Sequence, residues 1–140
     1  MPDNARPAYF TVHSLIHLRA AMKAGAVSGR PIVALSAPGA SAFAGAGWFA
    51  ALAEEGAAEY PEVALTAILD CRDRSGDVLA ALKIGLSHVI FTGSTSAAKR
   101  LAEVAAQTGA SVLTTRPEAF DLLDAQDPGY RAQIWCETAQ

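Results

Sequence analysis

Three residues of types that can do chemistry stand at the ends of short apolar runs in this sequence. His13 ends the run YFTVH, and Asp70 and Cys71 follow the run VALTAIL. Histidine transfers protons near neutral pH, a carboxylate can act as a general base, and a thiol becomes a nucleophile where a cation lowers its pKa. We therefore take His13, Asp70 and Cys71 as candidate catalytic residues, although residue types alone do not decide whether the protein is an enzyme.

Each of these residues also has a purely structural interpretation. Asp70 could accept hydrogen bonds from backbone amides of the following turn, as Asp commonly does. Cys71 could be a small buried hydrophobe, and His13 a solvated or core histidine. The neighbouring Arg72 and Arg74 would favour a Cys71 thiolate only if their side chains point at it.

A second set of residues, spread over three strand ends and the loops that follow them, could bind an anion. The segment GSTS at 93–96 opens a helical pattern and offers free amides, hydroxyl groups and the positive end of a helix dipole. An ordinary N-cap is the alternative interpretation of this segment. The turn at Pro38-Gly39 could do the same, although it lacks the Gly-Lys-Ser/Thr ending of a P-loop. The candidate ligand-binding residues are Ser36, Gly39, Thr92, Gly93, Ser94, Thr115 and Arg116.

No metal site and no cofactor are predicted. His13 and His17 are four residues apart, a spacing that on a helix can place two imidazoles on one face. His13 is expected to end a strand instead, and the glutamate of a zinc-protease motif is absent. His88 lies inside a predicted strand and is interpreted as structural.

The residues above depend on strands and helices that alternate along the chain. Ser14 and Ser41 are expected to cap the first two helices, which end at Gly25 or Gly29 and at Gly56. The tail over 130–136 alternates weakly, so it is expected to add an edge strand or to lie across the core. Strands are expected over 9–13, 31–36, 63–69, 87–91 and 111–115. Helices are expected over 15–26, 42–55, 75–86, 96–108 and 117–123.

This alternation predicts one α/β domain over 1–140, with a flexible arm at 1–7 and a C-terminal tail at 125–140. We expect a three-layer, flavodoxin-like fold with a five-stranded, mostly parallel sheet in the order 2-1-3-4-5. The crevice between its first and third strands would bring His13 and Ser14 opposite Asp70 and Cys71. The alternative is half of a (β/α)₈ barrel, which would expose one apolar face of its strands unless a dimer covered it.

The segment AFAGAGWFAALA over 42–53 has no polar face. A helix that is apolar all round is normally buried all round. The protein's own tail, including Trp135, could cover this segment, but we favour a homodimer with Phe43, Trp48 and Phe49 at the interface.

Composition excludes several classes of function. The formal net charge of −3, with no basic cluster, argues against nucleic-acid binding. The longest apolar run is shorter than the roughly 20 residues that a membrane helix needs. No signal peptide opens the chain, and the two cysteines do not form a disulfide framework. A soluble cytoplasmic protein with reduced thiols is therefore expected.

The motifs LSAPGA, ILDC and GDVLAALKIG resemble a small family of bacterial α/β proteins, a resemblance that implies no established function. A looser likeness is to response-regulator receiver domains, because Asp70, Thr92 and the Arg116-Pro117 pair occupy matching strand ends. The acidic pair that receivers carry after the first strand is replaced here by His13-Ser14. Aldolase-like barrels share the use of strand ends, but this chain has no lysine at a strand end for a Schiff base.

Three functional hypotheses follow. The leading one is a cytoplasmic domain that binds a small anionic metabolite at the carboxyl edge of its sheet. The alternatives are a non-catalytic homodimerising module and a degenerate receiver-like signalling domain.

Overall fold

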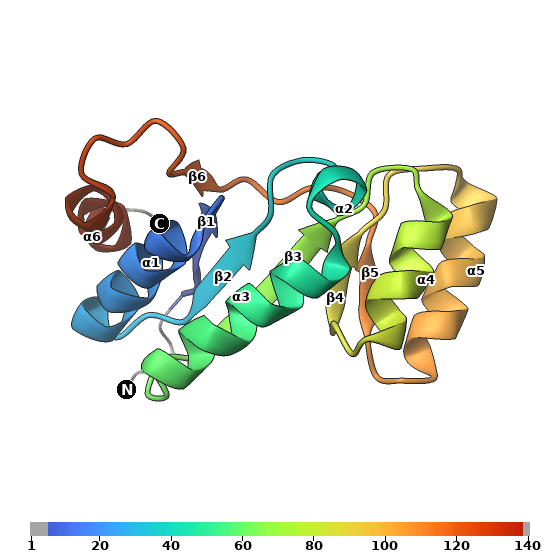
Figure 1. The fold of residues 1–140 in the computed structure, drawn as a ribbon, viewed down its shortest axis with the longest axis horizontal. Helices are drawn as coiled ribbons and strands as arrows, with labels where there is room; N and C mark the ends of the chain where they lie inside the picture. The colour runs from blue at the N-terminus through green and yellow to red at the C-terminus, as the bar shows by residue number, and fades with distance from the viewer. Residues whose placement is uncertain (1–5, 139–140) are drawn as a thin grey trace. The chain divides into compact units, whose positions relative to one another are not determined.

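The computed structural model describes residues 6–138, so most of the arm predicted over 1–7 lies outside the described residues. Strands are followed by helices along this part of the chain, with two consecutive helices after the second strand and two consecutive strands before the last helix (Figure 1). The strands are β1 (Ala8–Thr11), β2 (Ile32–Leu35), β3 (Leu65–Asp70), β4 (His88–Ile90), β5 (Ser111–Leu113) and β6 (Phe120–Asp121). The helices are α1 (Leu15–Ser28), α2 (Ala40–Phe43), α3 (Ala46–Glu59), α4 (Ser75–Lys83), α5 (Thr95–Ala106) and α6 (Pro128–Thr138).

The predicted class, α/β with a parallel sheet flanked by helices, is confirmed. The six strands follow the order β5-β4-β3-β2-β1-β6. On one side β1 pairs in parallel with β2, so that Phe10 lies opposite Ala34; on the other it pairs with β6, opposite Phe120. The flavodoxin-like order would place the third strand in the position that β6 occupies, so the order is that of the half-barrel alternative.

By its contacts the chain divides into two compact units, whereas the sequence predicts one domain. Unit 1 consists of residues 1–35, 52–66 and 118–140, and unit 2 of residues 36–51 and 67–117. In unit 1, β2, β1 and β6 lie side by side and α1 packs against α6. The largest fully buried side chains of unit 1 are Phe10, Leu18, Met22, Ile32, Leu35 and Leu122.

In unit 2 the strands β3, β4 and β5 pair in parallel, with Leu69 opposite Val89 and Val89 opposite Val112. Helices α4 and α5 follow successive strands and pack against each other, as right-handed crossovers in this order require. The largest fully buried side chains of unit 2 are Phe49, Leu69, Val78, Ile90 and Phe91.

Several predicted helix ends are confirmed because they depend only on nearby residues. The Ser14 hydroxyl accepts a hydrogen bond from the His17 N–H at 3.2 Å, and Ser94 caps α5 by accepting from the Ala97 N–H at 3.2 Å. Gly29 ends α1 with a φ of 74°, in the left-handed region that favours glycine.

The helix predicted over 42–55 is divided into α2 and α3. Gly45 lies between them with a φ of 86°, a backbone conformation that breaks the helix and suits glycine. Ser41 lies inside α2 and does not cap it. Gly56 lies inside α3 and does not end it. Glycine suits this position because of close packing, since a Cβ there would lie 2.5 Å from Leu18 Cδ2.

The helix predicted over 117–123 and the edge strand predicted over 130–136 were wrong, whereas the alternative, that the tail lies across the core, stays a prediction. The segment predicted as a helix over 117–123 instead contains β6, whose Phe120 meets Phe10 edge-on at 6.5 Å. The predicted edge strand over 130–136 lies within α6, because the Asp127 carboxylate caps this helix by accepting from the Tyr130 N–H at 3.1 Å.

Over residues 6–138, no helix combines the length and the apolar character that crossing a membrane requires.

Candidate functional site

The candidate site in unit 2 is built around Asp70, the last residue of β3. Its Oδ2 accepts from Arg116 Nη1 at 2.8 Å, and its own N–H donates to the Ser36 hydroxyl at 2.9 Å. Arg116 also donates to the Ser36 carbonyl oxygen at 2.9 Å. Asp70 is only 5% exposed. The structure therefore brings together three predicted site residues, and a buried carboxylate of this kind ties loops to one another.

Arg72, two residues after Asp70, is held in an unusual backbone conformation. Its φ of 51° makes it the one non-glycine residue with a positive φ in the described part of the chain. A left-handed conformation costs about 1–2 kcal/mol for such a residue. Two hydrogen bonds fix it, from the Arg72 N–H to Asp70 Oδ1 at 3.0 Å and from the Thr92 N–H to the Arg72 carbonyl at 2.7 Å.

The Arg72 side chain lies over Gly39. A Cβ on Gly39 would come within 2.9 Å of both Cδ and Nε of Arg72. The Arg72 guanidinium makes no hydrogen bond or ion pair with any other described residue, and the residue is exposed. Sequence reasoning did not include Arg72 among the ligand-binding residues, because its left-handed turn and its contact with Gly39 leave no signal in the local pattern.

The start of α5 adjoins Arg72 through Thr92. Thr92 and Ser94 are exposed, and Ser94 also caps the helix, so the N-cap interpretation of Ser94 is confirmed. Gly93 is closely packed, since a Cβ there would collide with the buried Phe91 ring. Thr115, next to Arg116, is exposed.

The surroundings of Cys71 do not favour its predicted role as a nucleophile, which stays a prediction. The side chain is fully buried, and burial raises the pKa of its thiol to about 11. A hydrogen bond with Ser41 opposes this rise in the Cys71 pKa only in part. Because the thiolate is the reactive form, a thiol with this pKa is almost wholly in its less reactive, protonated form near neutral pH. Cys71 is the small buried hydrophobe of the alternative interpretation.

His13 belongs to unit 1, where its partner is Asp121 of β6. His13 Nε2 lies 2.7 Å from Asp121 Oδ1, and the His13 N–H donates to His17 Nδ1 at 3.0 Å. Burial, with a smaller contribution from His13, lowers the pKa of His17. The sheet places β6, and not the third strand, beside β1 on the side away from β2, so the strand order on which the predicted crevice depended is not observed. The meeting of His13 with Asp70 stays a prediction.

His88 hydrogen-bonds through Nδ1 to the Ser87 hydroxyl at 2.8 Å. Over the described residues, no group of three or more His, Cys, Asp or Glu side chains could hold a metal ion.

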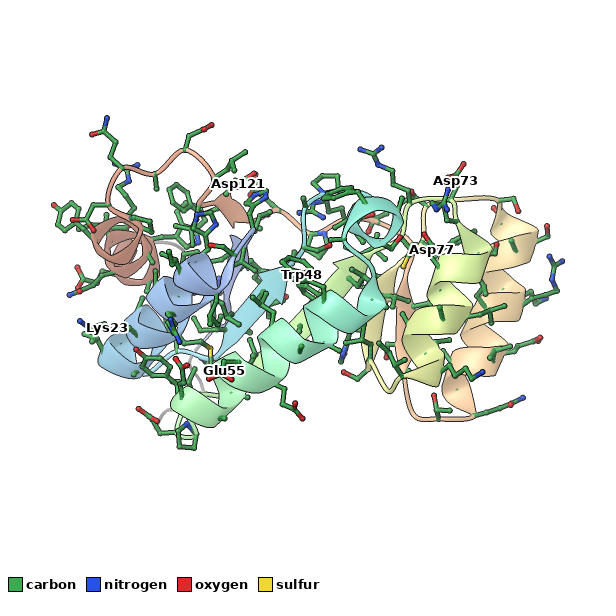
Figure 2. All side chains as sticks on the ribbon, in the orientation of Figure 1. Lys23, Trp48, Glu55, Asp73, Asp77 and Asp121 are labelled. Atoms are coloured by element: carbon green, nitrogen blue, oxygen red, sulfur yellow. The ribbon has the colours of Figure 1, made fainter. Side chains whose placement is uncertain are left out.

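The three residues predicted for a dimer interface differ in burial. Phe43 on α2 is 74% exposed and Trp48 is 39% exposed, but Phe49 is 1% exposed and belongs to the core. Figure 2 labels Trp48, which lies on α3. Phe49 therefore cannot contact a partner, which corrects that part of the prediction. Self-association through Phe43 and Trp48 stays a prediction.

No protein-family model and no curated protein matches this chain. Among solved structures, the chain is similar to one provisionally described as a fructose-1,6-biphosphate aldolase from Coccidioides immitis, with a TM-score of 0.62 and 18% sequence identity. The match covers 77% of this chain but only 44% of the aldolase chain, so this chain spans less than half of its length. The likeness concerns the fold, and a barrel-like aldolase agrees with the half-barrel strand order.

Proposed function

We propose that the protein is a cytoplasmic domain that binds a small anionic ligand at the carboxyl edge of the strands of unit 2. The observation that carries this proposal is the placement of Arg72. Its backbone is held in a left-handed conformation, its side chain lies over Gly39, and its guanidinium has no acidic partner among residues 6–138. A planar guanidinium binds carboxylates and phosphates with two parallel hydrogen bonds.

The surroundings of Arg72 support an anion over a neutral ligand. Thr92, whose N–H holds the Arg72 carbonyl, leads into the start of α5, a helix of 12 residues. The positive end of this helix dipole and the exposed hydroxyl groups of Thr92 and Ser94 favour negative charge. Arg116 is different, because its charge is balanced by Asp70.

Binding, rather than catalysis, is what these residues support. Both carboxylate oxygens of Asp70 already accept hydrogen bonds, and the Cys71 thiol is protonated. The same contacts do not favour a receiver-like function, since a phosphoacceptor carboxylate must be open to the phosphate donor.

The test is a titration of the protein with inorganic phosphate and, separately, with citrate, followed by amide chemical shifts in two-dimensional NMR. Wild type should show saturable shifts at Arg72, Gly93 and Ser94. Arg72→Gln should weaken binding about tenfold or more, as expected for loss of a charged hydrogen-bonding group. Arg100→Gln, on the exposed part of α5, changes the net charge equally and should leave binding unchanged. If wild type shows no saturable shifts, or the two variants bind alike, the proposal is wrong.

A further inference from the structure

Unit 1 contains a cavity of about 600 Å³, distinct from the residues around Arg72. It is lined by β6, by the loop that follows it and by the first turn of α6. Its volume lies in the range of about 300–1,000 Å³ that is usual for small-molecule sites. The side chains that matter below are Phe120, Asp121, Asp124, Asp127, Tyr130 and Arg131.

Two lining carboxylates have structural partners. Asp121 Oδ1 accepts from the Leu123 N–H at 2.9 Å and lies 2.7 Å from His13 Nε2. Asp127 caps α6 through the Tyr130 N–H. These contacts hold the loop and the helix start in place, and they explain why acidic residues occur at both positions.

The other two charges on the cavity have no such partner. Asp124 makes no hydrogen bond or ion pair with another described residue, and neither does the Arg131 guanidinium. Arg131 lies over the Phe120 ring, 5.6 Å from its centroid, and Phe120 in turn stacks on Trp135 at 5.1 Å. A cation on an aromatic face is held in place while its N–H groups stay available. Opposite charges therefore line one cavity without pairing with each other.

We propose that this cavity binds a small zwitterion of the α-amino acid class. The ligand carboxylate would pair with Arg131 and the ligand ammonium with Asp124, so that each unpaired charge gains its partner. Three carboxylates against one guanidinium favour a ligand with an ammonium group over a simple anion. The exposed ring of Tyr130, which lines the cavity, offers an apolar surface against which a large apolar side chain of the ligand could pack.

The first experiment is an NMR titration of the whole protein with each of the protein L-amino acids at up to about 10 mM, a range that detects weak binding. At least one should give saturable shifts at residues 120–131. L-Phenylalanine is the probe we expect to bind, and 3-phenylpropanoate and phenethylamine each lack one of its charges. Each analogue should bind about tenfold more weakly or worse.

Variants then assign the two charges. Asp124→Asn should weaken L-phenylalanine binding but leave 3-phenylpropanoate binding unchanged. Arg131→Gln should weaken L-phenylalanine and leave phenethylamine binding unchanged. General loss of structure cannot produce this crossed pattern, and Asp73→Asn serves as the charge-matched control in unit 2.

Arg72→Gln should leave amino-acid binding intact, so failure of one proposal does not affect the other. If no amino acid binds, or if Asp124→Asn and Arg131→Gln both bind L-phenylalanine like wild type, the inference is overturned.

Discussion

Two aspartates, one in each unit, occupy the same local motif. Asp70 and Asp121 are the last residues of parallel strands, and in each the Oδ1 accepts from the N–H two residues further on, at 3.0 Å and 2.9 Å. The residue that follows is fully buried in both cases: Cys71 after Asp70 and Leu122 after Asp121. The motif thus consists of an aspartate that holds its own turn and a buried side chain that anchors it.

The two aspartates differ in their surroundings. Asp70 is 5% exposed and pairs with Arg116, whereas Asp121 is 51% exposed and pairs with His13. Water screens the interaction between the partners of the exposed pair. When one partner of the buried pair is lost, water cannot take its place beside the remaining partner. The same turn therefore forms a rigid tie in unit 2 and a weak, solvent-accessible pair in unit 1. Burial decides this difference, not the motif.

The largest expected effect is that of breaking the buried pair. Asp70→Ala should lower the free energy of unfolding by about 3–5 kcal/mol, because it leaves Arg116 without its carboxylate in a mostly buried position. Urea denaturation followed by circular dichroism measures this loss. A loss below about 1 kcal/mol would show that the tie is no stronger than a surface pair.

The next effect concerns Cys71, which occupies the position of Leu122 in the motif. With a pKa raised from the ordinary 9.0 to about 11, the folded protein should react with iodoacetamide at pH 8 about 100-fold more slowly than the unfolded chain. The measurement uses Cys136→Ala, which leaves Cys71 as the only cysteine. Equal rates for the folded and unfolded chain would contradict the burial of this thiol.

The same pKa shift has a consequence for stability. The unfolded chain loses the thiol proton at a lower pH than the folded protein does. The stabilisation of the folded state by the protonated Cys71 thiol is therefore complete below pH 9.0 and is lost as the pH rises towards about 11. Cys71→Ala should remove the part of the alkaline destabilisation that Cys71 causes.

The smallest effect is expected at the exposed pair. Asp121→Ala should cost less than about 1 kcal/mol, since water can replace the carboxylate as the partner of both the exposed His13 side chain and the Leu123 N–H. The difference between Asp70→Ala and Asp121→Ala, measured by urea denaturation under the same conditions, tests the comparison directly. Equal losses would mean that the shared motif, and not burial, sets the strength.

The elements that were predicted correctly depend on local chemistry. The caps at Ser14 and Ser94 follow from hydroxyl groups placed before helical patterns, and Gly29 follows from a left-handed helix end. The run at 31–36 contains β2, where all four side chains are buried, as in a strand covered on both faces. Asp70 was expected at a strand end, and it ends β3.

The elements that were missed depend on contacts between distant residues. Phe120 lies in a strand because β6 pairs with β1 and the Phe120 ring packs edge-on against Phe10. The local sequence, with Pro117 and the residues after it, suits a helix start instead. The partners of the candidate residues were missed for the same reason. His13 meets a residue 108 positions away and Asp70 one 46 positions away, and no local pattern encodes either pairing.

By itself, the sequence determined the alternation of strands and helices, the parallel α/β class and the placement of polar residues at strand ends. These follow from hydrophobic periodicity and turn chemistry, which act over a few residues. Only the tertiary structure decided that β6 lies beside β1, that Asp70 is neutralised by Arg116 and that Arg72 is left without a partner. Which charge is buried or balanced is set by packing between segments far apart in the chain, since that packing decides which groups water can reach.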